Sequence, residues 1–381
     1  MPDESPAAHM PVKSSRLRVG DWVEVKSKEE ILQTLDAEGR LDGMPFMPEM
    51  LAFCGQRFQV YKRAHKTCDT VFPVRGRRVS GAVHLDTRCD GSAHGGCQAS
   101  CLLFWKDAWL KPVSDPAHSA PSPFADNGMR RSTASGVGCT ESVLWDRAQS
   151  HDSGHATPIF SCQATQLPYA TTALEWWDIR QYAEDLISGN VTLWDIVCGA
   201  AYFFFLWLSN LGIGLGRPIR WTFDHLHPLW RGAPFPRRCG TIPEGMSTPA
   251  VDLNLQPGDL VRIKPYKEIL KTLNSRNRNR GLYFDAEEVP YCGQTHRVGK
   301  RVTRIIEERT GKMLEMKTPC YTLESVICRS RYSECRLFCP RSIHPYWREI
   351  WLERLDPPRA QAPSEDCSRA LAENLSSVGR P

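Results

Sequence analysis

The chain contains the same segment twice. "LRVGDWVEVKSKEEILQTLD", from Leu17, is matched by "LQPGDLVRIKPYKEILKTLN", from Leu255, at an offset of 238 residues. The same offset relates "FCGQ" at Cys54 to "YCGQ" at Cys292, and "FWKDAWL" matches "YWREIWL" after an insertion of four residues. The duplicated unit covers about 95 to 100 residues. Two copies are too few for a solenoid, so the duplication predicts two related domains.

Each copy has the pattern of a small β-rich unit. After a Gly-Asp turn, Val23 and Val25 alternate with polar residues, as on a half-buried strand. "SKEE" from Ser27 fits a helix N-cap with glutamate at the third helical position. Further short strands are expected after this helix. The predicted fold class is therefore α+β, mainly β.

Two resemblances extend this interpretation. "LxxGDxVxVK" resembles the start of SH3-like barrels, including KOW and Tudor-type modules. The whole chain also resembles a bacterial family of uncharacterised proteins marked by "AHKTCDT", "RCDGSAHGGCQASCLLFWKDAWL" and "CPRSIHPYWREIWLERL". The resemblance implies two duplicated SH3-like barrel domains joined by a helical, hydrophobic middle segment. Such modules usually bind other molecules, and no activity is transferred from the family.

Composition shifts suggest the domain boundaries. Pro, Ser, Ala and Gly dominate residues 112–136, which is typical of a linker. The expected organisation is a disordered tail over 1–16, copy one over 17–111, the linker over 112–136, a helical middle region over 137–250 with its hydrophobic segment at 191–216, copy two over 251–356, and a disordered tail over 357–381.

The chain has fifteen cysteines, and they favour a metal site over a disulfide framework. The first residues, "MPDESPAAHMPVKSS", contain no apolar stretch of the kind found in a secretory signal, so we expect a cytoplasmic protein with reduced thiols. Reduced cysteines clustered at short spacings point to metal binding.

Both copies carry a cysteine triplet with the spacing C-x6/7-C-x3-C. A closed zinc site needs four Cys or His ligands, so each triplet predicts three of them. The fourth ligand in copy one is Cys68, His94 or Cys54, and in copy two Cys292 or Cys320. Cys139 and Cys162 from the middle region are further candidates to complete a site in copy one. The predicted ligands are Cys68, Cys89, His94, Cys97 and Cys101 in copy one, and Cys328, Cys335 and Cys339 in copy two.

Other roles for these cysteines stay open at this stage. Buried thiols behave as small hydrophobic residues, so simple core packing is the main alternative. Three or four thiolates could also hold an iron–sulfur cluster instead of zinc. His94 precedes Cys97 by three residues, but closeness in sequence does not make a catalytic pair, and we predict no catalytic residue.

The middle region contains 21 residues without a formal charge, Ile196 to Gly216. We expect a helix packed between the domains. The alternatives are a helix lying in a membrane surface and a membrane span. Peripheral membrane contact through 191–216 is therefore one predicted interaction.

Charge suggests a further partner. Copy two holds 20 basic and 12 acidic residues, whereas copy one holds 14 and 12. A basic barrel can bind phosphate backbones, so nucleic acid is one alternative partner, and a protein is the favoured one. The leading functional hypothesis is a non-enzymatic binding or scaffold protein with a structural, cysteine-liganded zinc site. A thiol- or metal-dependent redox or tailoring enzyme and a nucleic-acid-binding module are the alternatives.

Overall fold

Each copy folds around one curled antiparallel sheet. The computed structural model describes residues 16–71, 75–115, 139–150, 158–212, 214–230 and 232–355. The predicted C-terminal tail, nearly all of the N-terminal one and most of the predicted linker lie outside these residues. In copy one the strand order is β8-β7-β4-β1-β9. The bounds are β1 Trp22–Val25, β4 Arg57–Arg63, β7 Ala82–Arg88, β8 Leu102–Lys106 and β9 Leu110–Pro112.

Copy two repeats this sheet in the same register. Its order is β17-β16-β13-β18, and Leu260 pairs with Arg297 just as Trp22 pairs with Gln59 in copy one. Tyr321 and Trp347 form an isolated bridge in place of the β7–β8 pairing. The strands are β13 Leu260–Ile263, β16 Thr295–Ile306, β17 Met313–Leu323 and β18 Leu352–Arg354. The duplication seen in the sequence is therefore a duplication of strand pairing.

A short helix and two tryptophans close each sheet. Ser27 caps α1 (Lys28–Leu32) through a reciprocal capping box with Glu30. Trp109 is fully buried and donates its indole N–H to Thr34 Oγ1 over 3.1 Å. In copy two α7 (Tyr266–Leu270) takes the place of α1, and Trp351 donates to Thr272 Oγ1 over 3.0 Å. Both cores are thus closed by the same indole–threonine contact.

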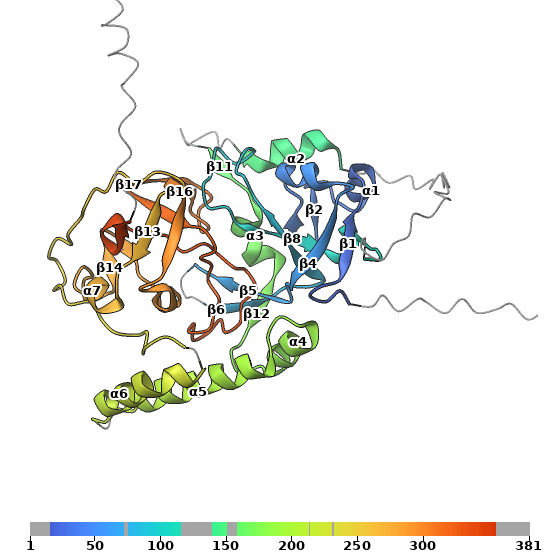
Figure 1. Ribbon diagram of the computed structural model, residues 1–381. Coiled ribbons are helices and arrows are strands. Elements are labelled where there is room, and N and C mark those ends of the chain that lie inside the picture. Colours follow the sequence, from blue (N-terminus) through green and yellow to red (C-terminus); the bar gives the residue numbers. More distant parts are fainter. Residues whose placement is uncertain are drawn as a thin grey trace, which may run out of the picture.

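The middle region is helical and packs on both copies. Its first part lies on copy one, where Leu144 and Leu167 join the hydrophobic core. Its last part lies along copy two, where Tyr202 and Leu206 join the second core. Figure 1 shows α4, α5 and α6 as a layer along one side of the two sheets. The helices are α2 Glu141–Ala148, α3 Gln163–Ala170, α4 Arg180–Ser188, α5 Leu193–Ser209 and α6 Gly216–Leu226.

Shorter elements complete the two copies. In copy one β5 and β6 form a three-stranded sheet with β12 from the middle region. A 3-10 helix follows the first hairpin of each copy, η1 (Pro48–Phe53) and η4 (Ala286–Tyr291). The remaining bounds are β2 Arg40–Leu41, β3 Met44–Pro45, β5 Lys66–Asp69, β6 Arg75–Arg78, η2 Asp107–Trp109, β10 Gln149–Ser150, β11 Ile159–Phe160, β12 Thr172–Leu174, η3 His227–Trp230, β14 Arg278–Asn279, β15 Leu282–Tyr283 and η5 Glu349–Trp351.

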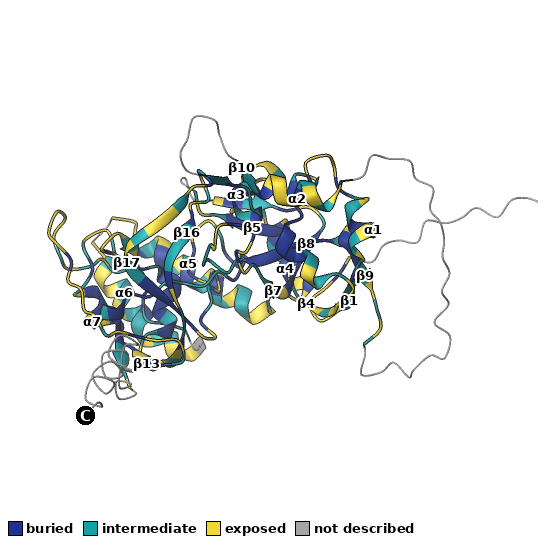
Figure 2. Cartoon of the chain, turned by 90° about the horizontal axis from the view of Figure 1, so that it is seen from above, coloured by how far each residue is buried: buried dark blue, intermediate teal, exposed yellow. Residues whose placement is uncertain are grey.

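The cysteine stretch of each copy packs against the other copy. From copy one, the Gln98 side-chain oxygen accepts the Thr303 backbone N–H of β16 over 2.7 Å. From copy two, the Leu337 carbonyl accepts a bond from the Lys66 ammonium of β5 over 2.8 Å. Figure 2 shows the dark, buried segments of copy one around β5 and β8, with β16 of copy two to one side of them. The two stretches therefore hold the copies together reciprocally.

The chain is a mixed α/β protein in which helix and strand content are about equal. Most of the strands form two curled half-barrel sheets, one in each copy, and the expectation of a mainly β chain underestimated the helices of the middle region. No helix in the described part of the chain has the length and apolar character needed to cross a membrane.

Candidate metal centre

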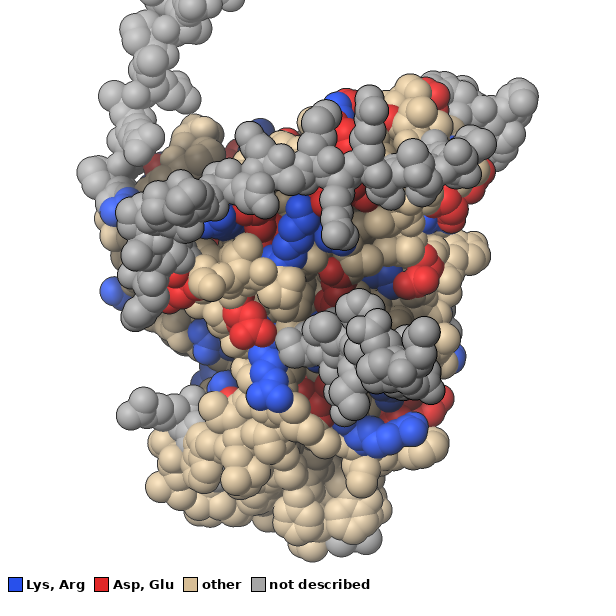
Figure 3. All heavy atoms as spheres, turned by 90° about the vertical axis from the view of Figure 1, so that its right-hand side faces the viewer, with Lys and Arg blue, Asp and Glu red and all other residues tan. Residues whose placement is uncertain are grey.

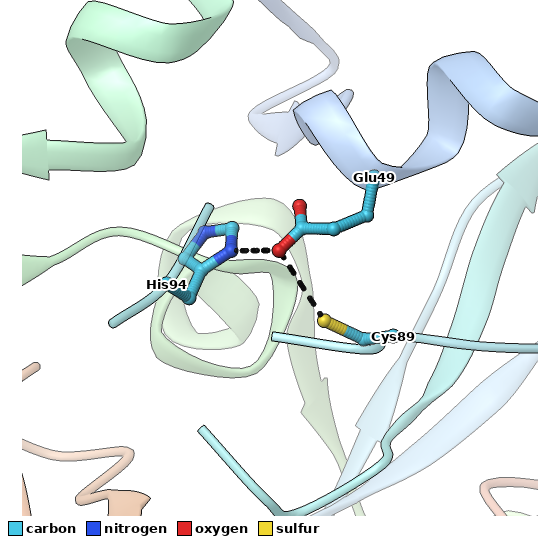
Figure 4. A group of neighbouring side chains, drawn as sticks. All are labelled: Glu49, Cys89 and His94. Atoms are coloured by element: carbon cyan, nitrogen blue, oxygen red, sulfur yellow. Dashed lines mark hydrogen bonds and ion pairs between the residues drawn. The ribbon is translucent and has the colours of Figure 1, made fainter. Parts of the chain in front are cut away.

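Three side chains from separate parts of copy one converge on one point. Glu49 comes from η1, Cys89 directly follows β7, and His94 lies in the turn after it (Figure 4). His94 Nδ1 lies 2.6 Å from Glu49 Oε1, and the Cys89 thiol donates to the same oxygen over 3.7 Å. Among the described residues this is the one group of three such side chains whose ligand atoms all lie within 4.8 Å of one another. Glutamate, cysteine and histidine are all zinc ligands.

The turn after Cys89 sets this geometry. Gly91 adopts φ +77°, and a Cβ there would lie 2.2 Å from the Cys97 carbonyl oxygen, so only glycine fits. The tight turn lets the Ala93 backbone N–H donate to Glu49 Oε1 over 3.1 Å. The turn therefore folds back onto the glutamate of η1, and His94 follows directly.

The group is buried and closes around one carboxylate oxygen. Glu49 and His94 are both buried, and Glu49 Oε2 has no hydrogen-bond partner. His94 Nε2 lies 3.2 Å from the Ser161 carbonyl, which requires a proton on Nε2. With Nε2 protonated, Nδ1 of a neutral ring would direct a lone pair at the carboxylate oxygen. At 2.6 Å the contact is a hydrogen bond from a ring that carries a proton on Nδ1 as well, and a metal ion bound here would replace that proton. A carbonyl bond to the outer ring nitrogen is also the usual arrangement around a metal-bound histidine.

More thiols line the small cavity beside this group. The cavity measures about 30 Å³, and its wall includes Cys97, Cys101 and Cys162 together with Ile306 of β16. Burial raises the pKa of Cys101 to about 12 and also raises the pKa values of Cys89 and Cys162. These thiols stay protonated unless a metal ion displaces their protons. The cavity has room for an ion or a water molecule but not for a substrate.

Copy two provides an internal control. Glu287 is equivalent to Glu49, and the Tyr332 backbone N–H donates to it as that of Ala93 does to Glu49, which puts Ser333 in the place of His94. Glu287 Oε1 accepts the Ser333 hydroxyl over 3.0 Å and the Tyr332 backbone N–H over 2.5 Å. Cys328 is equivalent to Cys89, but its thiol lies 3.4 Å from the Ser330 hydroxyl, and burial raises its pKa. Copy two therefore keeps the buried glutamate but satisfies it with neutral donors.

The predicted ligand Cys68 lies outside the Glu49–Cys89–His94 group. It lies on β5 and contacts Cys339 of copy two, whose thiol donates to it. This bond and the charge of the buried Arg341 lower the pKa of Cys68 to about 6, while burial raises that of Cys339 well above its usual value. Arg341 also donates to the Cys68 carbonyl over 3.3 Å. The contact joins the two copies.

The pseudo-symmetry explains this contact. Position 68 of copy one is equivalent to Ile306 of copy two. Each residue faces the cysteine stretch of the other copy. Cys68 contacts Cys339, and the Ile306 N–H lies 3.4 Å from Cys97 Sγ. Cys335 is exposed and lies beside α4 and α5 instead of facing Cys68.

The remaining candidate cysteines lie elsewhere. Cys54 and Cys292 end η1 and η4, and Cys320 packs against Met316 with its sulfur 3.3 Å from the thioether. Cys139 packs in the core of copy one. Glu49 was not among the predicted ligands. Its signals in the sequence were its place in an otherwise apolar segment, residues 44–53, and the glutamate at the equivalent position of copy two, Glu287.

Comparisons with protein-family models, with curated proteins and with solved structures found no match for this chain. The candidate metal-binding group Glu49–Cys89–His94 is therefore the main guide to function.

Proposed function

We propose that the chain is a non-enzymatic binding or scaffold protein whose first copy is fastened by a structural zinc ion held by Glu49, Cys89 and His94. The observation that carries this proposal is the closed group itself, in which three ligand-type atoms lie within 4.8 Å of one another beside an unpartnered carboxylate oxygen. One of the thiols lining the cavity supplies the fourth ligand of a closed site.

A structural role fits the surroundings of the group better than catalysis. The cavity is too small for a substrate, and its wall is built from copy one, from the segment that contains Cys162, and from β16 of copy two. A metal bound there stabilises the contact among three parts of the chain. In this proposal the two half-barrel sheets are SH3-like modules, and binding surfaces on them carry the activity.

Metal content is the decisive measurement. The full-length protein, purified without oxygen and without added metal, is expected to contain about one zinc per chain, since one such group exists in the described residues. Glu49→Gln, Cys89→Ser and His94→Ser are each expected to lower the zinc content strongly. Cys328→Ser, at the equivalent cysteine of copy two, is the matched control and should leave it unchanged.

The same assay identifies the fourth ligand and tests the alternative. Among Cys97→Ser, Cys101→Ser and Cys162→Ser, the variant that weakens zinc binding marks the fourth ligand. Iron with visible absorbance would contradict the structural zinc site and support a redox enzyme. Absence of metal from the wild-type protein, even after incubation with zinc, would also contradict it.

A further inference from the structure

Helix α5 is hydrophobic on all sides, yet only one side is covered. Gly199, Tyr202 and Leu206 face copy two and are buried. On the other side Trp194 and Trp207 are 60% and 59% exposed. A helix that is apolar all round is normally buried, so the open side of α5 lacks a covering surface.

The exposed apolar surface continues onto the neighbouring elements. We call it the helical face. Figure 3 shows a broad uncharged region at the end of the molecule formed by the helical layer. A groove of about 860 Å³ opens on it between α4, α5 and the loop that contains Leu337 and Phe338. The exposed apolar side chains of the helical face, inside and outside the groove, are Trp176, Trp177, Ile179, Leu186, Ile187, Leu193, Trp194, Val197, Phe204, Trp207, Leu211, Leu215, Trp221 and Leu229.

Charges around the helical face are unevenly balanced. Every carboxylate between Trp176 and Leu229 pairs with a cation of the chain itself. The pairs are Asp178 with Arg78 and Arg180, Glu184 with Arg16, Asp185 with Lys66, Asp195 with Arg331, and Asp224 with Arg238. On α6, Arg217 is exposed, and no carboxylate of the described residues pairs with it, whereas the guanidinium of Arg220 lies 5.2 Å over the ring of the buried Phe235. The face therefore presents apolar side chains together with the positive charge of Arg217.

We propose that the helical face lies on an anionic membrane surface, with α5 in the plane of the lipid headgroups. Tryptophan is enriched at the boundary between headgroups and acyl chains, and the face exposes five tryptophans, at positions 176, 177, 194, 207 and 221. The exposed Arg217 supplies attraction to anionic lipid. Since the inner side of α5 belongs to the core of copy two, the helix contacts lipid with its outer side only. This inference does not depend on the metal.

Vesicle co-sedimentation of the full-length protein tests the proposal. Vesicles of phosphatidylcholine mixed with phosphatidylglycerol are compared with vesicles of phosphatidylcholine alone. We expect binding to the mixed vesicles, and quenching of tryptophan fluorescence when the lipids carry brominated acyl chains. Arg217→Gln should weaken binding about five-fold, because it removes one cation near the surface.

The apolar contribution has its own variant and control. The double variant Phe204→Ser with Trp207→Ser removes two exposed side chains and should weaken binding about ten-fold or more. Trp145→Ser changes a tryptophan that is 49% exposed on α2, away from the helical layer, and should bind as the wild type does. Circular dichroism checks that each variant is folded.

Three results would overturn the proposal. The first is absence of binding to either vesicle. The second is equal binding to both vesicles with no effect of Arg217→Gln, which would remove the role of anionic lipid. The third is a dimer in solution that the Phe204→Ser/Trp207→Ser double variant dissociates while vesicles bind nothing, which would show that a second copy of the chain covers the face.

Discussion

His94 and Ser333 occupy equivalent positions in the two copies, and each contacts the glutamate of its own copy. His94 Nδ1 lies 2.6 Å from Glu49 Oε1, and the Ser333 hydroxyl donates to Glu287 Oε1 over 3.0 Å. One substitution between the copies thus separates a group suited to a cation from a group that is satisfied by neutral donors. The difference makes the second copy a built-in reference for the first.

The first prediction concerns zinc and stability. Zinc should stabilise the wild-type protein by about 3 kcal/mol when its free concentration is about a hundred times its dissociation constant. His94→Ser should fold, because serine serves the same position in copy two, but it should gain no stability from zinc. Calorimetric unfolding with and without zinc measures both. Equal stabilisation of the two proteins would place the metal elsewhere.

The second prediction concerns the thiolate at the contact between the copies. The pKa of Cys68 is lowered from 9.0 to about 6, so between these values the unfolded chain binds a proton that the folded chain does not. The stability that this thiolate contributes should therefore grow as the pH rises from 6 to 9, by a few kcal/mol at most. Cys68→Ser should remove this pH dependence.

Urea unfolding in reducing buffer across that pH range measures the effect. Cys139→Ser, at a thiol in the core of copy one, is the control and should keep the slope of the wild type. Parallel pH profiles for the wild type and Cys68→Ser would show that the thiol is protonated in the folded state.

The third prediction concerns acid stability. Burial lowers the pKa of His84 from 6.5 to about 4, and its Nδ1 bonds the Leu103 carbonyl over 2.8 Å. Below pH 6.5 His84 becomes protonated in the unfolded chain but stays neutral in the folded chain. The free energy of unfolding should therefore fall as the pH drops toward 4. Between pH 6.5 and 4 the free energy of unfolding of the wild type should fall by about 3 kcal/mol more than that of His84→Phe. Denaturant titrations at a series of pH values test this, and identical acid profiles would contradict it.

The fourth prediction concerns the duplicated core contact. Thr34→Val and Thr272→Val each leave a buried indole N–H without its acceptor. Each should lower the free energy of unfolding by about 1 to 3 kcal/mol. Because the two sites lie in separate cores, the costs should add in the double variant. Chemical denaturation of the four proteins gives the comparison. A double variant far less stable than the sum would indicate coupling between the copies.

Much of the fold could be predicted from local patterns. The repeated Gly-Asp turns, the alternation at Val23 and Val25, and the Ser27 cap each depend on neighbours within a few residues, and the structure contains each element. The helix content of the middle region was underestimated. Several of its helices are short, and α2 and α4 owe their place to packing against the copies more than to a long apolar pattern.

The candidate site could be predicted only in part. The sequence singled out Cys89 and His94 by their spacing, and it offered Cys162 as a thiol that could complete the site. It could not identify Glu49, which is 40 residues from Cys89 and reaches it only because η1 packs on the turn. It also assigned Cys68 to the metal of copy one, whereas the structure places it against Cys339.

The sequence by itself determined that the chain is built twice, that each copy carries a cysteine triplet, and that one segment of 21 residues has no formal charge. Periodicity and spacing are local properties of the chain, so they can be read from the sequence before the fold is known. Only the tertiary structure decided that each cysteine stretch packs on the opposite copy and that one side of α5 stays uncovered. Those outcomes depend on which distant surfaces meet, and no local pattern encodes the shape of a partner surface that is far away in the chain.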